Sequence, residues 1–122
     1  MDSPRAVAES YWQAECARDL DAIMAHFHPD ATFQPAGNLL TGHTEIRTFY
    51  VDSIDRFPGL ECHIVREVRN GNEACLEWKA VLIDHAGLRH PLVGVNVIEV
   101  SGGKFNSVRA YFDQLSFYGQ NE

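Results

Sequence analysis

Hydrophobic residues follow a helical period through the first half of the chain. Ser3 and Pro4 form a helix start, because proline suits the first helical position, and a broad apolar face follows them. Asp19 is placed to cap a second, shorter helix, and Pro58 stops a third. We therefore expect helices near residues 4–16, 20–27 and 43–57, with a short strand over residues 31–34.

From residue 60 onward apolar and polar residues alternate with a period of two, which is typical of strands. Three turn signals interrupt this alternation: Asn70-Gly71, His85-Ala86-Gly87 and Gly102-Gly103. They predict an antiparallel meander of four strands, over residues 60–69, 73–84, 88–100 and 105–117. Helices followed by strands indicate an α+β protein, with the helices packed on one face of the sheet.

Turn lengths set the register of the strands, and the register decides which side chains share a face. A three-residue loop at His85 places Trp78 opposite Gly94, where the missing side chain leaves room for the indole. A two-residue loop at Gly102-Gly103 places Asn96 opposite Arg109. The face that we expect the helices to cover, called the inner face, then carries Leu76, Trp78, Ala80, Leu82, His90, Leu92, Gly94, Asn96, Arg109, Tyr111, Asp113 and Leu115.

The opposite, outer face of the predicted sheet is too apolar to be left in water. Because the helices of so short a chain can cover only one face, we expect a second subunit to cover the other. This predicts a homodimer through the strands over residues 88–100 and 105–117. The outer residues are Val81, Val93, Val95, Val97, Val108, Ala110 and Phe112.

Four polar side chains converge on the predicted inner face: His90, Asn96, Arg109 and Asp113. An apolar cavity with a few placed polar groups is the usual form of a small-molecule site, so we expect a small hydrophobic ligand. The alternative is that Arg109 and Asp113 form an ion pair at a wet sheet edge. His63 joins the face of Trp78 if the Asn70-Gly71 loop has two residues, and a three-residue turn reverses that.

Composition narrows the possible partners. Ten Lys and Arg against 17 Asp and Glu give a net charge of −7, so the basic footprint of a nucleic-acid binder is absent and binding to an anionic membrane is disfavoured. No apolar run approaches the roughly 20 residues of a membrane span. The three cysteines are widely spaced and indicate reduced thiols in a cytoplasmic protein. Neither a metal nor another cofactor is expected.

Several motifs in order resemble one family over nearly the whole chain, taken as a single domain of residues 1–122. The motifs are His28-Pro29-Asp30-Ala31-Thr32-Phe33, the stretch from Gly42 to Tyr50, and Gly103-Lys104-Phe105 leading to Ala110-Tyr111-Phe112-Asp113. They resemble the SnoaL-like branch of the nuclear transport factor 2-like, or ketosteroid isomerase-like, superfamily. The resemblance implies a cone, in which a curved antiparallel sheet wraps around three N-terminal helices. It also implies a pocket between the two layers, and dimers through the open sheet face are common in the family.

The resemblance also implies roles for individual residues. Tyr11 falls where a ketosteroid isomerase keeps its oxyanion tyrosine, and Asn96 falls where that enzyme keeps a protonated aspartic acid. The general-base aspartate of that enzyme has no counterpart in the stretch from Phe33 to Ala36. Asp113 instead matches the last-strand aspartate that serves polyketide cyclases and limonene epoxide hydrolases as acid or base.

These matches favour a cyclase-like or isomerase-like enzyme that needs no cofactor. It would transfer a proton on an apolar carbonyl substrate, with Asp113 as acid/base, His90 as proton partner, and Asn96 or Tyr11 polarising the carbonyl. The residues expected to bind the substrate are Trp78, Leu92, Arg109, Tyr111 and His63. Two alternatives stay open: an epoxide-hydrolase-like enzyme, and a non-catalytic dimeric domain that binds a hydrophobic ligand or supports assembly.

Overall fold

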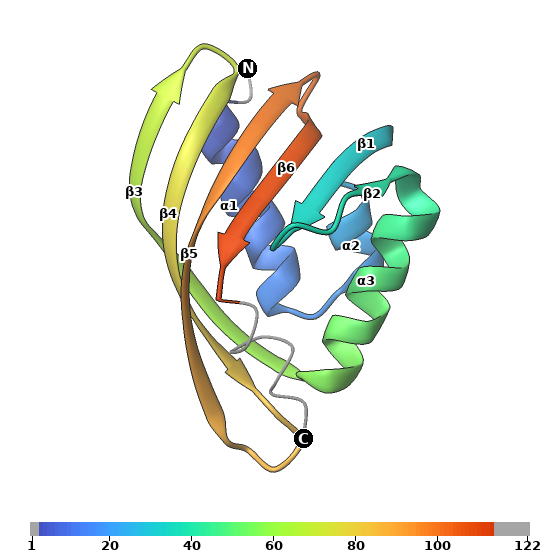
Figure 1. The fold of residues 1–122 in the computed structure, drawn as a ribbon, viewed down its shortest axis with the longest axis vertical. Coiled ribbons are helices and arrows are strands. Elements are labelled where there is room, and N and C mark those ends of the chain that lie inside the picture. Colours follow the sequence, from blue (N-terminus) through green and yellow to red (C-terminus); the bar gives the residue numbers. More distant parts are fainter. Residues whose placement is uncertain (1–2, 114–122) are drawn as a thin grey trace.

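A curved sheet wraps around the helices in the computed structural model, which describes residues 3–113 (Figure 1). Within this range the sheet has six strands in the order β2-β1-β6-β5-β4-β3, and the pairing is antiparallel except between β1 and β6. This arrangement confirms the α+β class and the cone around three helices. The elements are α1 (Pro4–Cys16), α2 (Leu20–Met24), β1 (Phe27–Pro35), β2 (Leu40–Thr41), α3 (Gly42–Arg56), β3 (Gly59–Asn70), β4 (Glu73–Ile83), β5 (Arg89–Ser101) and β6 (Lys104–Phe112).

Local chemistry accounts for the starts of the helices. The Ser3 hydroxyl accepts a hydrogen bond from the backbone N–H of Ala6, and the Asp19 carboxylate accepts one from that of Ala22. The second helix is shorter than expected, because Phe27 already belongs to β1. Pro29 explains this difference, since proline has no backbone N–H and favours an extended residue before it.

The predicted register between β4 and β5 is confirmed. Trp78 lies opposite Gly94, and Leu92 lies opposite Ala80. A Cβ atom added to Gly94 would lie 2.5 Å from Cζ2 of Trp78, so only glycine leaves room for the indole. The turn and the side-chain size therefore specify the same pairing.

The predicted register between β5 and β6 is wrong by one residue. The two-residue turn at Gly102-Gly103 forms as expected, but a bulge follows it, with Asn106 as the extra residue. Asn96 consequently pairs with Ala110 and not with Arg109. Because a shift of one residue moves every side chain to the other face, the inner positions of β6 are Val108, Ala110 and Phe112, and the outer ones include Arg109 and Tyr111.

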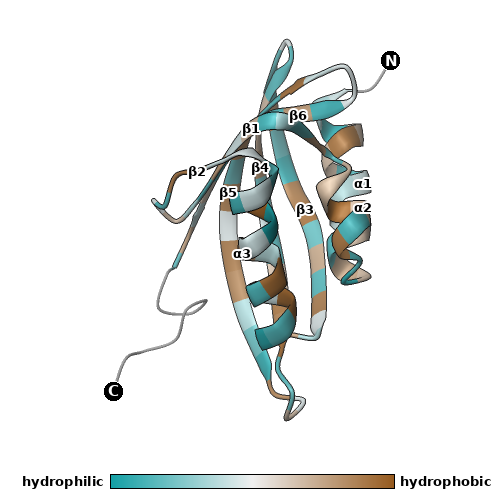
Figure 2. Ribbon diagram, turned by 90° about the vertical axis from the view of Figure 1, so that its right-hand side faces the viewer, coloured by the Kyte–Doolittle hydropathy of each residue, from teal (hydrophilic) through white to brown (hydrophobic). Residues whose placement is uncertain are grey.

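A bulge also decides the position of His63 on β3. The turn uses Gly71 and Asn72, and the extra residue Val65 shifts the register once more. His63 then pairs with Lys79 and is exposed on the outer face, away from Trp78. Hydrophobic and hydrophilic positions alternate along β3 in Figure 2, as expected for a strand with one buried face.

The core between the helices and the sheet is rich in aromatic rings. Tyr11 of α1 and Tyr50 of α3 are buried, and both rings make close contacts with Phe27 of β1. Edge-to-face and tilted pairs of this kind add to the stabilisation from burial. Over residues 3–113, none of the helices is long and apolar enough to cross a membrane.

Candidate functional site

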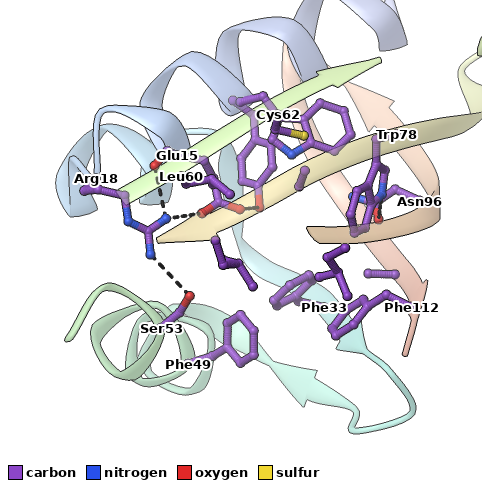
Figure 3. A pocket seen from close by; sticks show the side chains of 16 residues that line it. Glu15, Arg18, Phe33, Phe49, Ser53, Leu60, Cys62, Trp78, Asn96 and Phe112 are labelled. Carbon is purple, nitrogen blue, oxygen red and sulfur yellow. Dashed lines mark hydrogen bonds and ion pairs between the residues drawn. The ribbon is translucent and has the colours of Figure 1, made fainter. Parts of the chain in front are cut away.

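A cavity of about 70 Å³ lies between the helices and the inner face of the sheet (Figure 3). Its walls are mostly aromatic and aliphatic, and α1, α3, β1 and four further strands contribute to them. The apolar walls include Trp12, Phe33, Phe49, Trp78, Leu92 and Phe112. A cavity of this composition suits a small apolar ligand that is oriented by few polar groups.

Tyr11, Glu15 and Tyr50 form a hydrogen-bonded chain at one side of this cavity. Tyr11 and Glu15 are four residues apart on α1, so they share one face of the helix. The Tyr11 hydroxyl donates to Oε2 of Glu15 at 2.7 Å, and the hydroxyls of Tyr11 and Tyr50 are also hydrogen-bonded. Since the one hydrogen of Tyr11 points to Glu15, Tyr50 is the donor to Tyr11.

Arg18 holds the other oxygen of the Glu15 carboxylate. Its Nη1 donates to Oε1 at 3.2 Å and to the backbone oxygen of Glu15 at 3.1 Å, and its Nη2 donates to Oγ of Ser53 at 3.4 Å (Figure 3). The two side chains are only 9% (Arg18) and 14% (Glu15) exposed, so this ion pair is shielded from water. Arg18 adopts a left-handed φ of 54°, uncommon for a residue with a side chain, just after α1 ends.

Burial changes the acid–base properties of this group. It raises the pKa of the Glu15 carboxyl, and the opposing effects of the Tyr11 hydrogen bond and the Arg18 charge are smaller. Burial, reinforced by the Glu15 charge, also raises the pKa of Tyr11 and of Tyr50 well above the ordinary value. The tyrosines are therefore protonated donors at neutral pH, and Glu15 is a buried carboxyl that holds a proton more readily than an exposed one.

Asn96 supplies a polar group on the sheet side of the cavity. Its Oδ1 accepts a hydrogen bond of 2.9 Å from Nε1 of Trp78, and the residue is only 6% exposed. With the oxygen engaged by the indole, the amide nitrogen of Asn96 is the group that can donate to a ligand oxygen. Figure 3 shows Asn96 and Trp78 together on one wall.

Four of the residues predicted from the sequence line the cavity: Tyr11, Trp78, Leu92 and Asn96. His90 is on the inner face, as expected, but it lies outside this lining. Its Nε2 is 2.9 Å from Oδ2 of Asp84, and its ring packs against Phe57.

The other four predicted residues are not brought to the cavity. Arg109 and Tyr111 lie on the outer face because of the β6 bulge, and His63 lies there because of the β3 register. Asp113 is exposed and follows the last residue of β6, so its predicted place on the inner face is wrong. Leu115, the last residue predicted for that face, lies outside the described residues.

Sequence reasoning missed Glu15, Arg18 and Tyr50. Glu15 could have been found from its spacing to Tyr11, because four residues place its carboxylate on an otherwise apolar helix face. The approach of α3 to α1 has no such local signal. Among residues 3–113, no three histidine, cysteine, aspartate or glutamate side chains come together in a way that could hold a metal ion.

The family model of the SnoaL-like domain matches residues 8–108, and the chain belongs to this family. The chain is similar in fold to an LEH-like epoxide hydrolase of M. tuberculosis, with a TM-score of 0.79 and 24% identity over 94% of this chain and 86% of that one. A putative SnoaL-like polyketide cyclase of Shewanella denitrificans gives a TM-score of 0.80 at 13% identity, over 96% and 95%. The chain is also similar to a hypothetical protein of Catenulispora acidiphila with a ketosteroid isomerase-like fold, solved in complex with trimethylamine. The TM-score is 0.81 and the identity 16%, over 93% of this chain and 90% of that one.

Proposed function

We propose that the protein is a cofactor-independent enzyme that transfers a proton on a small, largely apolar carbonyl compound. The observation that carries the proposal is a buried carboxyl, Glu15, that is hydrogen-bonded to Tyr11 in an apolar cavity. Burial raises the pKa of this carboxyl, so it holds a proton more readily than an exposed one, which suits a group that takes up and returns a proton.

The proposed reaction begins with removal of a proton from the carbon next to the substrate carbonyl. Oε2 of Glu15 accepts this proton, while Arg18 holds Oε1 and keeps the carboxylate in place. The electron pair of the broken C–H bond moves to the carbonyl oxygen. The Asn96 amide, which lines the same cavity, donates a hydrogen bond to the enolate oxygen formed. Glu15 then returns the proton to the substrate carbon skeleton, so no other reactant is needed.

Asp113 is the alternative acid/base, and its support is the resemblance of its sequence context to cyclases and epoxide hydrolases. Its exposure and its position beyond β6 favour Glu15. The two assignments predict opposite results for the same pair of variants, Glu15→Gln and Asp113→Asn. Each substitution nearly preserves shape and removes a basic oxygen.

The experiment starts with a thermal-stabilisation screen of small apolar ketones, lactones and aromatic carbonyl compounds, followed by an assay of each ligand for turnover or hydrogen exchange. We expect Glu15→Gln to lower the rate by a factor of 10² to 10⁴, on the order expected for loss of a general base, and Asp113→Asn to leave it unchanged. The reverse result would assign the reaction to Asp113. Binding without turnover in the wild type would support the non-catalytic domain instead.

A further inference from the structure

Ser10 and His26 form a hydrogen-bonded pair of the kind that supports nucleophilic chemistry. Neither residue lines the inner cavity. Oγ of Ser10 on α1 is 2.8 Å from Nε2 of His26, just after α2. The other ring nitrogen, Nδ1, is 2.7 Å from the backbone oxygen of Ala22. Since a carbonyl can only accept, Nδ1 carries the hydrogen of the neutral ring, and Nε2 accepts the hydrogen of the Ser10 hydroxyl.

This arrangement has three parts of an activated nucleophile: a hydroxyl, a base within hydrogen-bond distance, and a third group that orients the base. The rings of Tyr11 and His26 also pack in a T-shaped arrangement, with centroids 6.2 Å apart, which further limits rotation of the His26 ring. Ser10 is exposed, so its oxygen can be reached from solvent.

Ser101 and His28 are also close together, but their hydrogen bonding differs from that of Ser10 and His26. His28 also approaches a serine, but its Nε2 is 2.7 Å from the backbone oxygen of Ser101 and 3.4 Å from that residue's Oγ. Nε2 of His28 therefore carries the hydrogen in the neutral ring and cannot accept one from Ser101. The pair of Ser101 and His28 is a natural control for the pair of Ser10 and His26.

A surface pocket of about 310 Å³ contains Ser10 and His26. The apolar residues Ala6, Val7 and Ala25 line this pocket, together with Gly102 and Gly103 of the turn between β5 and β6. Lys104, the first residue of β6, also belongs to the lining of the pocket. The pocket thus combines space for a short apolar chain with a nucleophile and a base, and its lining includes a lysine.

We propose that Ser10 and His26 form an acyl-transfer site for small activated esters with a short apolar acyl group. Oγ of Ser10 attacks the ester carbonyl carbon and gives its proton to Nε2 of His26. The bond to the leaving alcohol breaks, and the alcohol leaves with that proton, so the acyl group remains as an ester of Ser10. Water then attacks this ester with the help of His26, which releases the carboxylic acid and restores the hydroxyl.

The test uses the full chain and p-nitrophenyl acetate. We expect release of nitrophenol, a single acetyl group in the intact mass, and peptide mapping that places it on Ser10. The variant Ser10→Ala should lose the adduct, and His26→Gln should slow acetylation by a factor on the order of 10². The matched control Ser101→Ala should react like the wild type. Glu15→Gln should also react normally, which separates this site from the proposed proton transfer.

Two results would overturn the proposal. One is an acetyl group on Lys104 or other amines while Ser10 stays unmodified. The other is equal nitrophenol release by the wild type and by Ser10→Ala. Because Ser10 is exposed, its replacement by alanine should leave the circular dichroism spectrum and the melting temperature of the protein unchanged, so a loss of reaction reports chemistry and not unfolding.

Discussion

The Tyr11 hydroxyl donates a hydrogen bond of 2.7 Å to the Glu15 carboxylate one turn further along α1. Both groups are inside the protein, where a charge without partners would be costly. The carboxylate has a donor on each oxygen, Tyr11 on Oε2 and Arg18 on Oε1. These two donors stabilise the charge of the Glu15 carboxylate in a mostly apolar cavity. Their effect on the pKa of Glu15 can be measured without a known substrate.

Removing the Tyr11 hydroxyl should raise the pKa of Glu15 further. The hydrogen bond from Tyr11 is the largest of the effects that lower this pKa, so Tyr11→Phe leaves burial less opposed. Carbon-13 NMR titration of the Glu15 carboxyl measures the change. Tyr50→Phe is the matched control, because Tyr50 bonds to Tyr11 and not to Glu15, and it should move the Glu15 pKa much less. An equal shift in both variants would contradict the assignment.

Glu15 should also make the stability of the fold depend on pH. Its pKa is higher in the folded than in the unfolded chain, so between these two values the folded state binds more protons. The free energy of unfolding contributed by Glu15 is therefore fully present below the ordinary glutamate pKa and falls as the pH rises through the raised one.

Urea unfolding of the wild type and of Glu15→Gln, from about pH 4 to about pH 8, tests this dependence. We expect the unfolding free energy of the wild type, minus that of Glu15→Gln, to fall as the pH rises. The absolute stability of the variant does not matter, because only the change of the difference with pH reports the titration. A difference that stays constant over this range would show that Glu15 titrates alike in both states.

Gly94→Ala should destabilise the fold by about 1–3 kcal/mol, as expected for overpacking. The added Cβ would lie 2.5 Å from Cζ2 of Trp78 and 2.6 Å from the backbone oxygen of Tyr111. Urea unfolding measures the loss. In a Trp78→Phe background the same change should cost less, because the smaller ring removes one of the two clashes. The same cost in both backgrounds would mean that the indole does not set this limit.

We propose that the outer face of β4, β5 and β6 joins two copies of the chain. Val93 and Tyr111 on this face are 62% and 55% exposed, and Val95 lies opposite Tyr111. Val95→Asp would place a charge among these apolar side chains, so sedimentation should show a dimeric wild type and a monomeric or aggregated variant. Val51→Asp, at an exposed position on α3, is the control and should stay dimeric. A wild type that is monomeric at micromolar concentration would refute the proposal.

Apart from the short strand β2, which the sequence did not predict, the order of the elements and the pairing of β4 with β5 were predicted, because these depend on local signals. Alternation, turn residues and the complementary sizes of Trp78 and Gly94 all indicate the same register. The bulges at Val65 and Asn106 have a weaker signal. The alternation breaks there, at Ile64-Val65 and at Asn106-Ser107, but neither bulge residue is a glycine or a proline that would mark it.

Local signals in the sequence also predicted part of the candidate site. Tyr11 and Asn96 lie on elements whose buried faces follow from periodicity, and the cavity contains both. Tyr50 reaches Tyr11 only because α3 packs on β1 and α2, which turns this side chain toward α1, and the two residues are 39 positions apart. Contacts between elements this distant arise from tertiary packing, which a single hydrophobic pattern does not specify.

The extra residue Asn106 gives β6 a property that substitutions alone would not reveal. Deleting Asn106 would leave the pairs of Phe105 with Val100 and of Ser107 with Glu99 in place, so the ladder with β5 would become regular and Val108, Ala110 and Phe112 would still face the helices. An uninterrupted ladder that kept Asn106 would instead place Arg109 opposite Asn96, and the cavity wall would then bear a guanidinium and a phenol. Loss of this single codon would therefore keep the pocket wall neutral, whereas loss of the bulge with the residue retained would charge it.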